Sequence, residues 1–470
     1  MSVRTACAAL AAASLLTLFG RHPVSAEPLH AGIAVADITP PLGYRMSGYF
    51  HERLATGVRN PLHAKALVLR QGEQRAALVF CDLIGLPLQL TTQVRREASE
   101  KTGIPEANIL VAATHTHTGP LYCGALRQHF HDLAVAEHGS DPREKVDYPA
   151  QLAGNLVEAI AQANDALRAV RLEAGTTKQE GLAFNRRFHM DDGSVRFNPG
   201  VGNPHIVRAA GPTDPQVGIL LFRDAADGQP LAVLVNFALH LDTVGGTEYA
   251  ADYPYFLERA LREKLGEDLV VLFGTGTCGD INHIDVTKKE RLATETIGTT
   301  LAATVAETVP ELSPVEPPTL AVRSETVHAP LQTYSDEQLA QARRDIHKVG
   351  TRELSFLDQV RAYKVLALAQ RGGETIPLET QVFRFGKEVA LVGLPGEVFV
   401  ELGLAIQRDS PFATTLVVEL CNDAPGYIPT AKAFAEGSYE TVNSRIAPGG
   451  GEKLVGAAAG LLKELGGETP

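Results

Sequence analysis

The sequence is short of basic residues. Its 43 Lys and Arg stand against 55 Asp and Glu, so the formal net charge is −12 at pH 7. Because phosphate binding needs clustered Lys and Arg, and no basic run is present, nucleic acid is excluded as the expected partner. The apolar share of 44% and the charged share of 21% are those of a folded globular protein.

Long apolar runs are also missing beyond the first 26 residues. No later stretch approaches the roughly 18 to 20 apolar residues of a spanning helix, so we expect no transmembrane segment in the mature chain. Residues 1–26 have the pattern of an export signal, because Arg4 precedes the apolar run ACAALAAASLLTLFG and small residues precede Glu27. We therefore expect this signal peptide to be removed and the mature protein to be periplasmic or secreted.

Two further motifs are absent. The sequence has no C-x-x-C pair, so its cysteines do not indicate a structural zinc site. It also has no G-x-S-x-G, which disfavours a serine hydrolase. The cysteines after the signal are buried apolar residues or, in an oxidising compartment, members of disulfides. They are Cys81, Cys123, Cys278 and Cys421.

Short apolar segments that alternate with helical patterns dominate the rest of the chain. Several are continuously apolar, which is typical of strands buried on both faces. Typical strand segments are AGIAVADIT, AKALVLR, AALVFCD, NILVAAT, VGILLF, LAVLVNFALH, DLVVLFG, LETQVFRFG, VALVGL and TLVVELC. The alternation predicts an α/β fold, with one mixed sheet or two packed sheets covered by helices. We expect a single catalytic domain over residues 27–470, with a helical insertion at 320–380.

Polar residues follow the strong strand segments at the points where the strands end. In α/β proteins ligand sites form at the carboxyl ends of strands, and imidazoles with a carboxylate suit a zinc ion that keeps one position open for water. The candidates are His115 and His117 after NILVAAT, His240 after LAVLVNFALH, Asp280 and Asn282 after DLVVLFG, and Glu397 after VALVGL. Zinc lowers the pKa of its water to about 7, which suits hydrolysis near neutral pH.

Each of these residues also has an alternative role. A pair of histidines can belong to the core or to a loop, Glu397 can stabilise the start of the helix that follows it, and Asp280 can be a turn residue. The histidines at 129, 131 and 138 lie in a predicted polar loop exposed to solvent. His and carboxylate ligands also suit iron, nickel or copper, so the residues alone leave the metal open.

The motifs together resemble the neutral/alkaline non-lysosomal ceramidase family, in its catalytic N-terminal domain. The similar segments are AGIAVADITPPLG, ATHTHTGP, VNFALH, GTGTCGDIN, LPGE and GYIPTAKAFAEGSYE, which span about residues 30 to 445. The resemblance implies a zinc ion held by His115, His240, Glu397 and Tyr439. It further implies that His117 stabilises the substrate oxyanion. Nothing but the resemblance singles out Tyr439, which otherwise reads as a surface loop residue.

The sequence departs from the family at two places. The family has a Ser two residues after the loop Asp, where this chain has Asn282, which can donate a hydrogen bond but cannot act as a nucleophile. We also expect no C-terminal immunoglobulin-like domain. In FNRRF, Arg186 and Arg187 are candidates for binding an anionic or sugar-like group of the substrate, or are a solvated basic pair.

The sequence thus predicts an exported zinc amidohydrolase of sphingolipid metabolism that cleaves the N-acyl amide of ceramide or a related lipid. Its partner would be a small-molecule or lipid substrate, with Asp280 and Asn282 beside His117 in the catalytic group. The alternatives are a zinc hydrolase of a different amide, ester or sugar-derived substrate, and a non-catalytic ligand-binding protein. If the loops of Cys123 and Cys278 both border the metal, we also expect a disulfide between them. The oligomeric state stays open.

Overall fold

Two packed β-sheets, covered by helices on their outer faces, form the framework of the protein. The computed structural model describes residues 27–467, so the predicted signal peptide lies outside the described residues. Within this range nine strands form the larger sheet. In spatial order they are β14 (Val270–Thr275), β12 (Pro230–Phe237), β11 (Gln216–Asp224), β6 (Arg168–Lys178), β1 (His30–Asp37), β3 (His63–Gln71), β4 (Gln74–Cys81) and β5 (Ile109–Ala113), with β16 (Ser313–Pro314) beside β6.

The smaller sheet has four strands and packs on the larger one. Its strands, in order, are β17 (Leu320–Pro330), β18 (Thr375–Phe385), β19 (Val389–Gly393) and β21 (Thr414–Val418). Apolar residues of both sheets, such as Phe80, Phe222, Phe383 and Leu416, form one core cluster between them. This packing explains why strands such as β4 are apolar without alternation, since both of their faces are buried.

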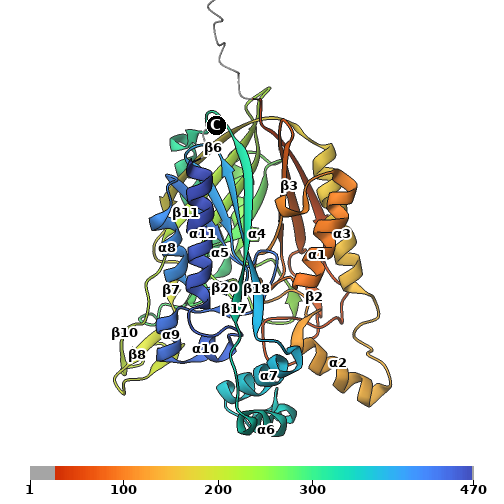
Figure 1. Cartoon of the computed structure of the whole chain (residues 1–470), viewed down its shortest axis with the longest axis vertical. Coiled ribbons are helices and arrows are strands. Elements are labelled where there is room, and N and C mark those ends of the chain that lie inside the picture. Colours follow the sequence, from red (N-terminus) through yellow and green to blue (C-terminus); the bar gives the residue numbers. More distant parts are fainter. Residues whose placement is uncertain (1–26, 468–470) are drawn as a thin grey trace, which may run out of the picture.

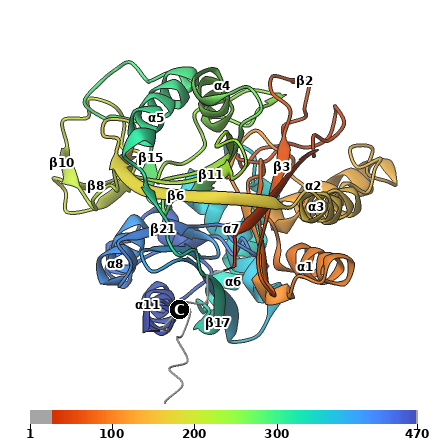
Figure 2. The ribbon, with the colours of Figure 1, turned by 90° about the horizontal axis from the view of Figure 1, so that it is seen from above.

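Helices complete the outer layers (Figure 1). The larger sheet is covered by α1 (Leu88–Thr102), α3 (Tyr148–Asp165), α4 (Tyr253–Leu265) and α5 (Thr294–Thr308), and the smaller one by α8 (Val400–Asp409) and α11 (Gly450–Gly467). Figure 2 shows α4 and α5 on one side of β6, and α8, α11 and β17 on the other. The predicted mixed α/β class, with two sheets, is confirmed. Among the helices of residues 27–467, not one combines the length and the apolarity that crossing a bilayer requires.

The helical insertion predicted at 320–380 is only partly helical. It contains α6 (Asp336–Asp345) and α7 (Phe356–Arg371), but its two ends are the strands β17 and β18, which pair along the whole length of β17. The middle of β17 is polar and exposed, so its own pattern is weak. Pairing with β18 and packing against α11 hold it as a strand.

The predicted polar loop with three histidines is also wrong. His129, His131 and His138 lie on helix α2 (Gly124–His138), which ends at Gly139 in the left-handed conformation that glycine adopts most easily. Phe130 is the buried residue of this helix. A helix with so little buried surface has little apolar periodicity to reveal it in the sequence.

Smaller strand pairs lie at the ends of these elements. They are β2 (Gly57–Val58) with β13 (Glu248–Tyr249), β7 (Phe184–Asn185) with β15 (Ile281–Asn282), β20 (Glu397–Val398) with β22 (Tyr427–Ile428), and the sheet of β10 (Ile206–Ala209), β8 (Arg187–Met190) and β9 (Val195–Phe197). Two short helices, α9 (Ala431–Glu436) and α10 (Tyr439–Asn443), follow β22. A bridge between Ala112 and Cys421 joins the end of β5 to the segment after β21, so strand ends of both sheets meet.

Candidate metal centre

Three imidazoles converge where β5 and β12 end. The Nε2 atom of His240 lies 3.0 Å from Nε2 of His115 and 3.1 Å from Nε2 of His117. His115 and His240 are buried, at 3% and 1% exposure. The backbone N–H of His117 donates to the Leu241 carbonyl at 3.0 Å, which locks the two strand-end segments together. The structure therefore brings together the histidines that the sequence placed at separate strand ends.

Neighbouring carbonyls determine which ring nitrogen faces the cluster. Nδ1 of His115 lies 2.6 Å from the Ile84 carbonyl, and Nδ1 of His240 lies 3.4 Å from the Cys278 carbonyl. A carbonyl can only accept, so each Nδ1 carries the proton and each Nε2 presents a lone pair. His115 has a positive φ of 78°, which is uncommon for a side chain of this size. Such local strain is found mainly at functional sites.

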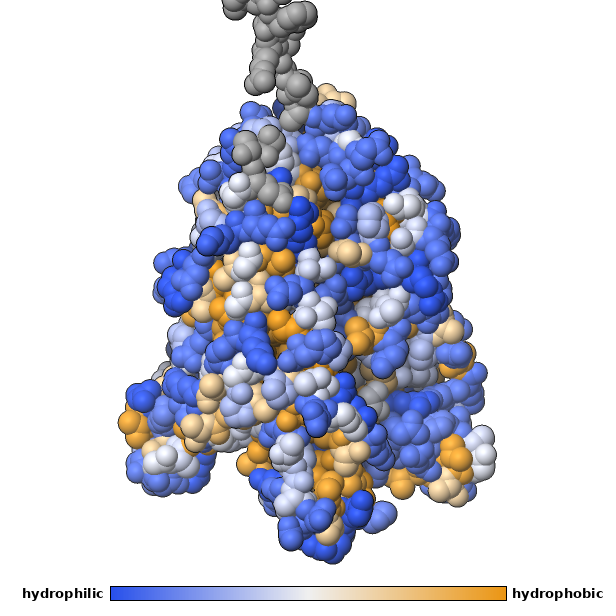
Figure 3. All heavy atoms as spheres, viewed as in Figure 1, coloured by the Kyte–Doolittle hydropathy of each residue, from blue (hydrophilic) through white to orange (hydrophobic). Residues whose placement is uncertain are grey.

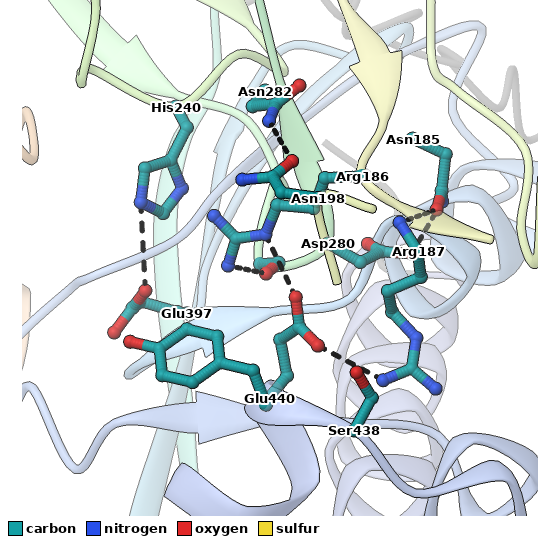
Figure 4. A network of polar contacts seen from close by, with 12 residues as sticks. Asn185, Arg186, Arg187, Asn198, His240, Asp280, Asn282, Glu397, Ser438 and Glu440 are labelled. Carbon is teal, nitrogen blue, oxygen red and sulfur yellow. Dashed lines mark hydrogen bonds and ion pairs between the residues drawn. The ribbon is translucent and has the colours of Figure 1, made fainter. Parts of the chain in front are cut away.

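Glu397 and two tyrosines complete the arrangement. Oε2 of Glu397 is 3.4 Å from Nε2 of His115 and 4.0 Å from Nε2 of His240. Tyr427 lies opposite Glu397 in the β20–β22 pair, and its ring packs 5.4 Å from the ring of Tyr439. The Tyr439 hydroxyl accepts a hydrogen bond from Asn443 at 3.1 Å. Figure 4 shows Glu397 facing the His240 ring.

This donor set fits a metal cation. The Nε2 lone pairs of His115 and His240, which lie 3.0 Å apart, repel each other unless a cation lies between them. Oε2 of Glu397 is buried and has no hydrogen-bond partner among the described residues, which a native carboxylate rarely tolerates without an ion. Nitrogen and carboxylate ligands of this kind are typical of zinc. His115, His117 and His240 could bind it together, with Glu397 adjacent.

Burial keeps His117 and His240 neutral, and a metal ligand such as His240 must be neutral to bind. Removal from water, followed by the charge of His115, lowers the pKa of His117 to about 4 and the pKa of His240 well below its usual value. Burial alone would raise the pKa of Glu397, but His115, Tyr427 and Arg186 outweigh it and lower that pKa. The centre thus combines two neutral imidazoles, of His117 and His240, with a charged carboxylate.

A cavity of about 170 Å³ opens beside the centre. Its walls include Ser47, Gly48, Tyr49, Phe50, Ile84, His115, His117, Leu121, Leu126, Tyr363, Glu397, Tyr427, Tyr439 and Asn443. Gly48 has a φ of 102°, and a Cβ added there would lie 2.7 Å from the Cβ of His117. Glycine at 48 is therefore required by the close approach of this loop to the histidine.

The structure places Tyr439 on the cavity wall, and its role as a metal ligand, which the resemblance implies, stays a prediction. Its side chain is 8% exposed, and its ring lies 4.8 Å from Phe197 and 5.1 Å from Phe356. Burial and the charge of Glu397 raise the pKa of its phenol, so ionisation would need the charge of a bound cation. The surface-loop alternative for Tyr439 is wrong.

Arg186 and Arg187 are buried, so the solvated basic pair considered as an alternative is wrong. They are 3% and 1% exposed, and both bind Glu440, through Nε of Arg186 at 3.0 Å and Nη1 of Arg187 at 3.1 Å. Arg187 also bonds to Glu436 at 3.2 Å, so its charge is already paired within the protein. In Figure 4 the Arg186 guanidinium lies between Glu440 and Glu397. Substrate binding stays a prediction for Arg186 and has no support from the contacts of Arg187.

Asp280 and Asn282 do not line the cavity. Asp280 accepts hydrogen bonds from the Val400 amide at 2.9 Å and from Asn185 at 2.8 Å. Asn282 is fully buried, accepts from the Ile284 amide at 2.9 Å and donates to Asn198 at 2.8 Å. These contacts indicate that both residues shape the loops behind the centre, and a direct catalytic role stays a prediction.

The predicted disulfide is absent, because all four described cysteines are free thiols. Cys123 precedes the first residue of α2, whereas Cys278 is buried against Glu419, with Sγ 3.1 Å from Oε1. Both loops do border the centre, but their thiols face different neighbours. A disulfide requires two cysteine side chains that point toward each other, and two loops can lie close together without meeting this requirement.

Sequence reasoning missed Tyr427, the residue that links Glu397 to Tyr439. It is 4% exposed, and its ring lies 5.4 Å from the Tyr439 ring. The segment GYIPT contained a signal, since Gly426, with a φ of 95°, directly precedes the two-residue strand β22. A lone tyrosine in such a short strand nevertheless looks like an ordinary core residue.

A second cluster of histidine and carboxylates is already neutralised by arginines. His131, Asp141 and Glu144 lie close together on the α2 side of the molecule. Arg45 binds Asp141 at 2.6 Å, and Arg127 binds Glu144. These cations occupy the carboxylates, so this cluster is a salt-bridge network and not a second metal centre.

Comparison with known proteins identifies relatives of this arrangement. A family model for neutral/alkaline non-lysosomal ceramidase, N-terminal, matches residues 29–251. The neutral ceramidase of Pseudomonas aeruginosa is 28% identical over 221 residues, which cover 45% of this chain and 30% of that protein. The sequence match thus spans less than a third of the relative.

Solved structures share the fold over a longer range. The crystal structure of the neutral ceramidase from Pseudomonas aeruginosa superposes with a TM-score of 0.69 at 20% identity, covering 94% of this chain and 76% of that one. A structure of ceramidase complexed with C2 gives a TM-score of 0.68 at 18% identity, with the same coverage. The likeness therefore includes both sheets, beyond the residues that the family model matches.

Proposed function

We propose that the chain is a zinc-dependent hydrolase of N-acyl amides, because its residues 29–251 match the family model for neutral/alkaline non-lysosomal ceramidase. Its substrate would be ceramide or a related lipid, and its products a fatty acid and an amine. The observation that carries the proposal is the convergence of three imidazole Nε2 atoms beside the unpartnered Oε2 of Glu397.

The proposed ligands are His115, His240, Glu397 and Tyr439. A bound zinc ion would supply an electrophile for the carbonyl and a water of lowered pKa. His117 reaches the same cluster from two residues along the chain, and we assign it the stabilisation of the developing oxyanion. Preorganised donors of this kind act strongly where water is excluded.

An aromatic wall supports an acyl substrate. Phe356, whose side chain is 43% exposed, packs against Phe50, Phe197 and Tyr439, and Phe50 also packs against Tyr363. In Figure 3 apolar side chains gather at the lower end of the molecule, where Figure 1 places α6 and α7. A hydrocarbon chain could leave the cavity along this wall while its carbonyl stays beside the histidines.

The size of the cavity favours a second candidate, a hydrolase of a smaller amide or ester. Its volume is about 170 Å³, whereas pockets that enclose drug-sized ligands measure roughly 300 to 1,000 Å³. The cavity would hold the scissile group and little else. We also propose that residues 1–26 direct export, which N-terminal sequencing of the mature protein would test.

Metal analysis combined with a substrate panel tests the proposed function. We expect one zinc per chain, and hydrolysis that a chelator abolishes and zinc restores, on a panel of ceramides, N-acyl amino acids and simple esters. His240→Ala should lose the zinc. His205→Ala is the matched control, because this histidine lies on the surface with its side chain 66% exposed.

Three outcomes would separate the alternatives. Zinc without hydrolysis of any panel member would favour a ligand-binding protein. Hydrolysis of esters or small amides with ceramide untouched would favour the second candidate. Full zinc retention by His240→Ala would remove this residue from the ligands.

A further inference from the structure

A buried glutamate lies behind the metal centre and contacts the segments on both sides of it. Glu419 directly follows β21 and is fully buried. Its Oε2 accepts hydrogen bonds from the Cys278 amide at 3.2 Å and from the Val398 amide at 2.6 Å. Its Oε1 lies 3.1 Å from Sγ of Cys278. One carboxyl group therefore joins the segment after β14 to β20.

Each of these contacts leads to a residue proposed to bind the metal. The carbonyl of Cys278 faces Nδ1 of His240, and so sets the tautomer that leaves Nε2 free. Val398 directly follows Glu397. The amides of Glu397 and Phe399 bond to the neighbouring β22 side, at Gly426 and Ile428, which leaves the Val398 amide pointing the other way, toward Glu419.

We infer that Glu419 is a positioning residue, which fixes the His240 ring and the Glu397 backbone relative to each other. The role rests on the proposed metal site and extends it to a residue that does not itself reach the cluster. The backbone of Glu419 is fixed as well, because its amide donates to the Thr275 carbonyl at 2.9 Å. The side chain is thus anchored at the ends of β14 and β21.

A methionine in place of Glu419 would keep the volume and remove both acceptor oxygens. The amides of Cys278 and Val398 would then be buried without a partner, and the two segments would shift to find one. Loss of an outer partner of a metal ligand typically lowers metal affinity about 10- to 100-fold. We expect a loss of this size in Glu419→Met.

Glutamine should rescue the site. Burial raises the pKa of Glu419 well above its ordinary value, so an uncharged side chain of the same shape suits the position. The glutamine carbonyl can accept both amide hydrogens in the place of Oε2. Glu419→Gln should therefore bind zinc nearly as tightly as the wild type, which a role based on charge would not predict.

The test is zinc affinity, measured by chelator competition on the purified protein, with the absorption spectrum of the cobalt-substituted protein as a second readout of ligand geometry. Asp214→Ala is the matched control, because Asp214 is 6% exposed and accepts hydrogen bonds from Gln216 and Gln407 away from the centre. It should unfold more easily, with unchanged zinc affinity and cobalt spectrum.

Weaker zinc binding and an altered spectrum in Glu419→Met alone support the inference. Wild-type affinity in Glu419→Met, or an equal loss in Glu419→Gln, overturns it. If Glu419→Met does not fold, Glu419→Asp replaces it in the test. Its shorter side chain cannot reach both amides, so it should also bind zinc more weakly. A wild type that binds no zinc would overturn the proposed metal site as well, whereas a zinc-binding wild type with an unaffected variant overturns only this role.

Discussion

The three imidazoles of the centre differ in how the protein holds them. His115 is oriented by the Ile84 carbonyl and His240 by the Cys278 carbonyl. His117 is fixed through its backbone, by the bond to Leu241, and has its Nε2 near His240. A ring with this freedom suits a group that responds to the substrate better than one that holds a metal throughout the reaction.

His117→Ala should therefore reduce turnover far more than zinc content. Loss of one oxyanion donor typically lowers turnover about 100- to 1,000-fold, while the remaining ligands keep the ion. Zinc analysis and kcat on the best substrate of the panel measure the two effects. Zinc loss as complete as in His115→Ala would instead make His117 a ligand.

Asn282 does not line the cavity, so we expect any effect of this position on the substrate to pass through its hydrogen-bond partner Asn198. The Ile284 amide donates to Oδ1 of Asn282, so the NH₂ group of Asn282 donates to Oδ1 of Asn198. The NH₂ group of Asn198 therefore points away from Asn282. Serine at 282, as in the family, has too short a side chain for both bonds. We expect Asn282→Ser to change the ratio of ceramide to N-acyl amino acid hydrolysis while zinc content stays constant. An unchanged ratio would separate this position from substrate choice.

At the scale of elements, the apolar segments were predictable because burial on both faces leaves an unmistakable composition. The segments AALVFCD, VGILLF and DLVVLFG, for example, are β4, β11 and β14. The strands β6 and β17 were missed because polar residues interrupt them. Their structure depends on pairing with distant strands, and a local pattern does not contain that information.

The burial of Arg186 and Arg187 was unpredictable for the same reason. The segment FNRRF gives no hint of Glu440, which follows Tyr439 far along the chain and neutralises both side chains. The histidines and Glu397 could be predicted as a site because strands end beside them. Tyr439 required the family resemblance, since it lies on a short helix that only tertiary contacts place at the cavity.

Arg187→Ala should destabilise the protein strongly, because Arg187 connects β8 to α9 and α10. Its guanidinium bonds to Glu436, Glu440 and the Gly437 carbonyl. Removing one member of a buried ion pair typically costs about 3–5 kcal/mol. Urea unfolding measures the loss, with the exposed Arg196→Ala as a control that should change little. Equal stability of both variants would mean that the network is not needed to hold α10.

At the scale of the whole molecule, the site exists because two sheets end at one place. The amide of Ala113 bonds to the Leu420 carbonyl, and the amide of Asn422 bonds to the Val111 carbonyl. These bonds align the last residues of β5 with the segment after β21, and so bring ligands from both sheets to one cluster. The sequence shows which strands end in chemically active residues, but not which sheet edges meet.

A buried carboxyl group also makes the stability of the molecule depend on pH. Asp252 is fully buried, precedes α4, and accepts hydrogen bonds from the amides of Tyr253, Thr243 and Val244. Burial, assisted by the charge of Asp242, nevertheless raises its pKa to about 6 from an ordinary 3.8. Between these values the folded protein keeps a proton that the unfolded chain has released. The contribution of Asp252 to stability is therefore largest below about pH 4, decreases as pH rises through 6, and is constant above.

Asp252→Asn isolates this effect, because other titrating groups, including the histidines of lowered pKa, are common to both proteins. The variant should be less stable than the wild type at pH 4.5, since its NH₂ group faces backbone donors. The gap should narrow as pH rises to 7.5, by about 2 kcal/mol, because the interval from pH 4.5 to a folded pKa of about 6 covers roughly one and a half units. Urea unfolding of both proteins across this range measures the gap. A gap that stays constant or widens with pH would show that Asp252 is already ionised in the folded protein at acidic pH.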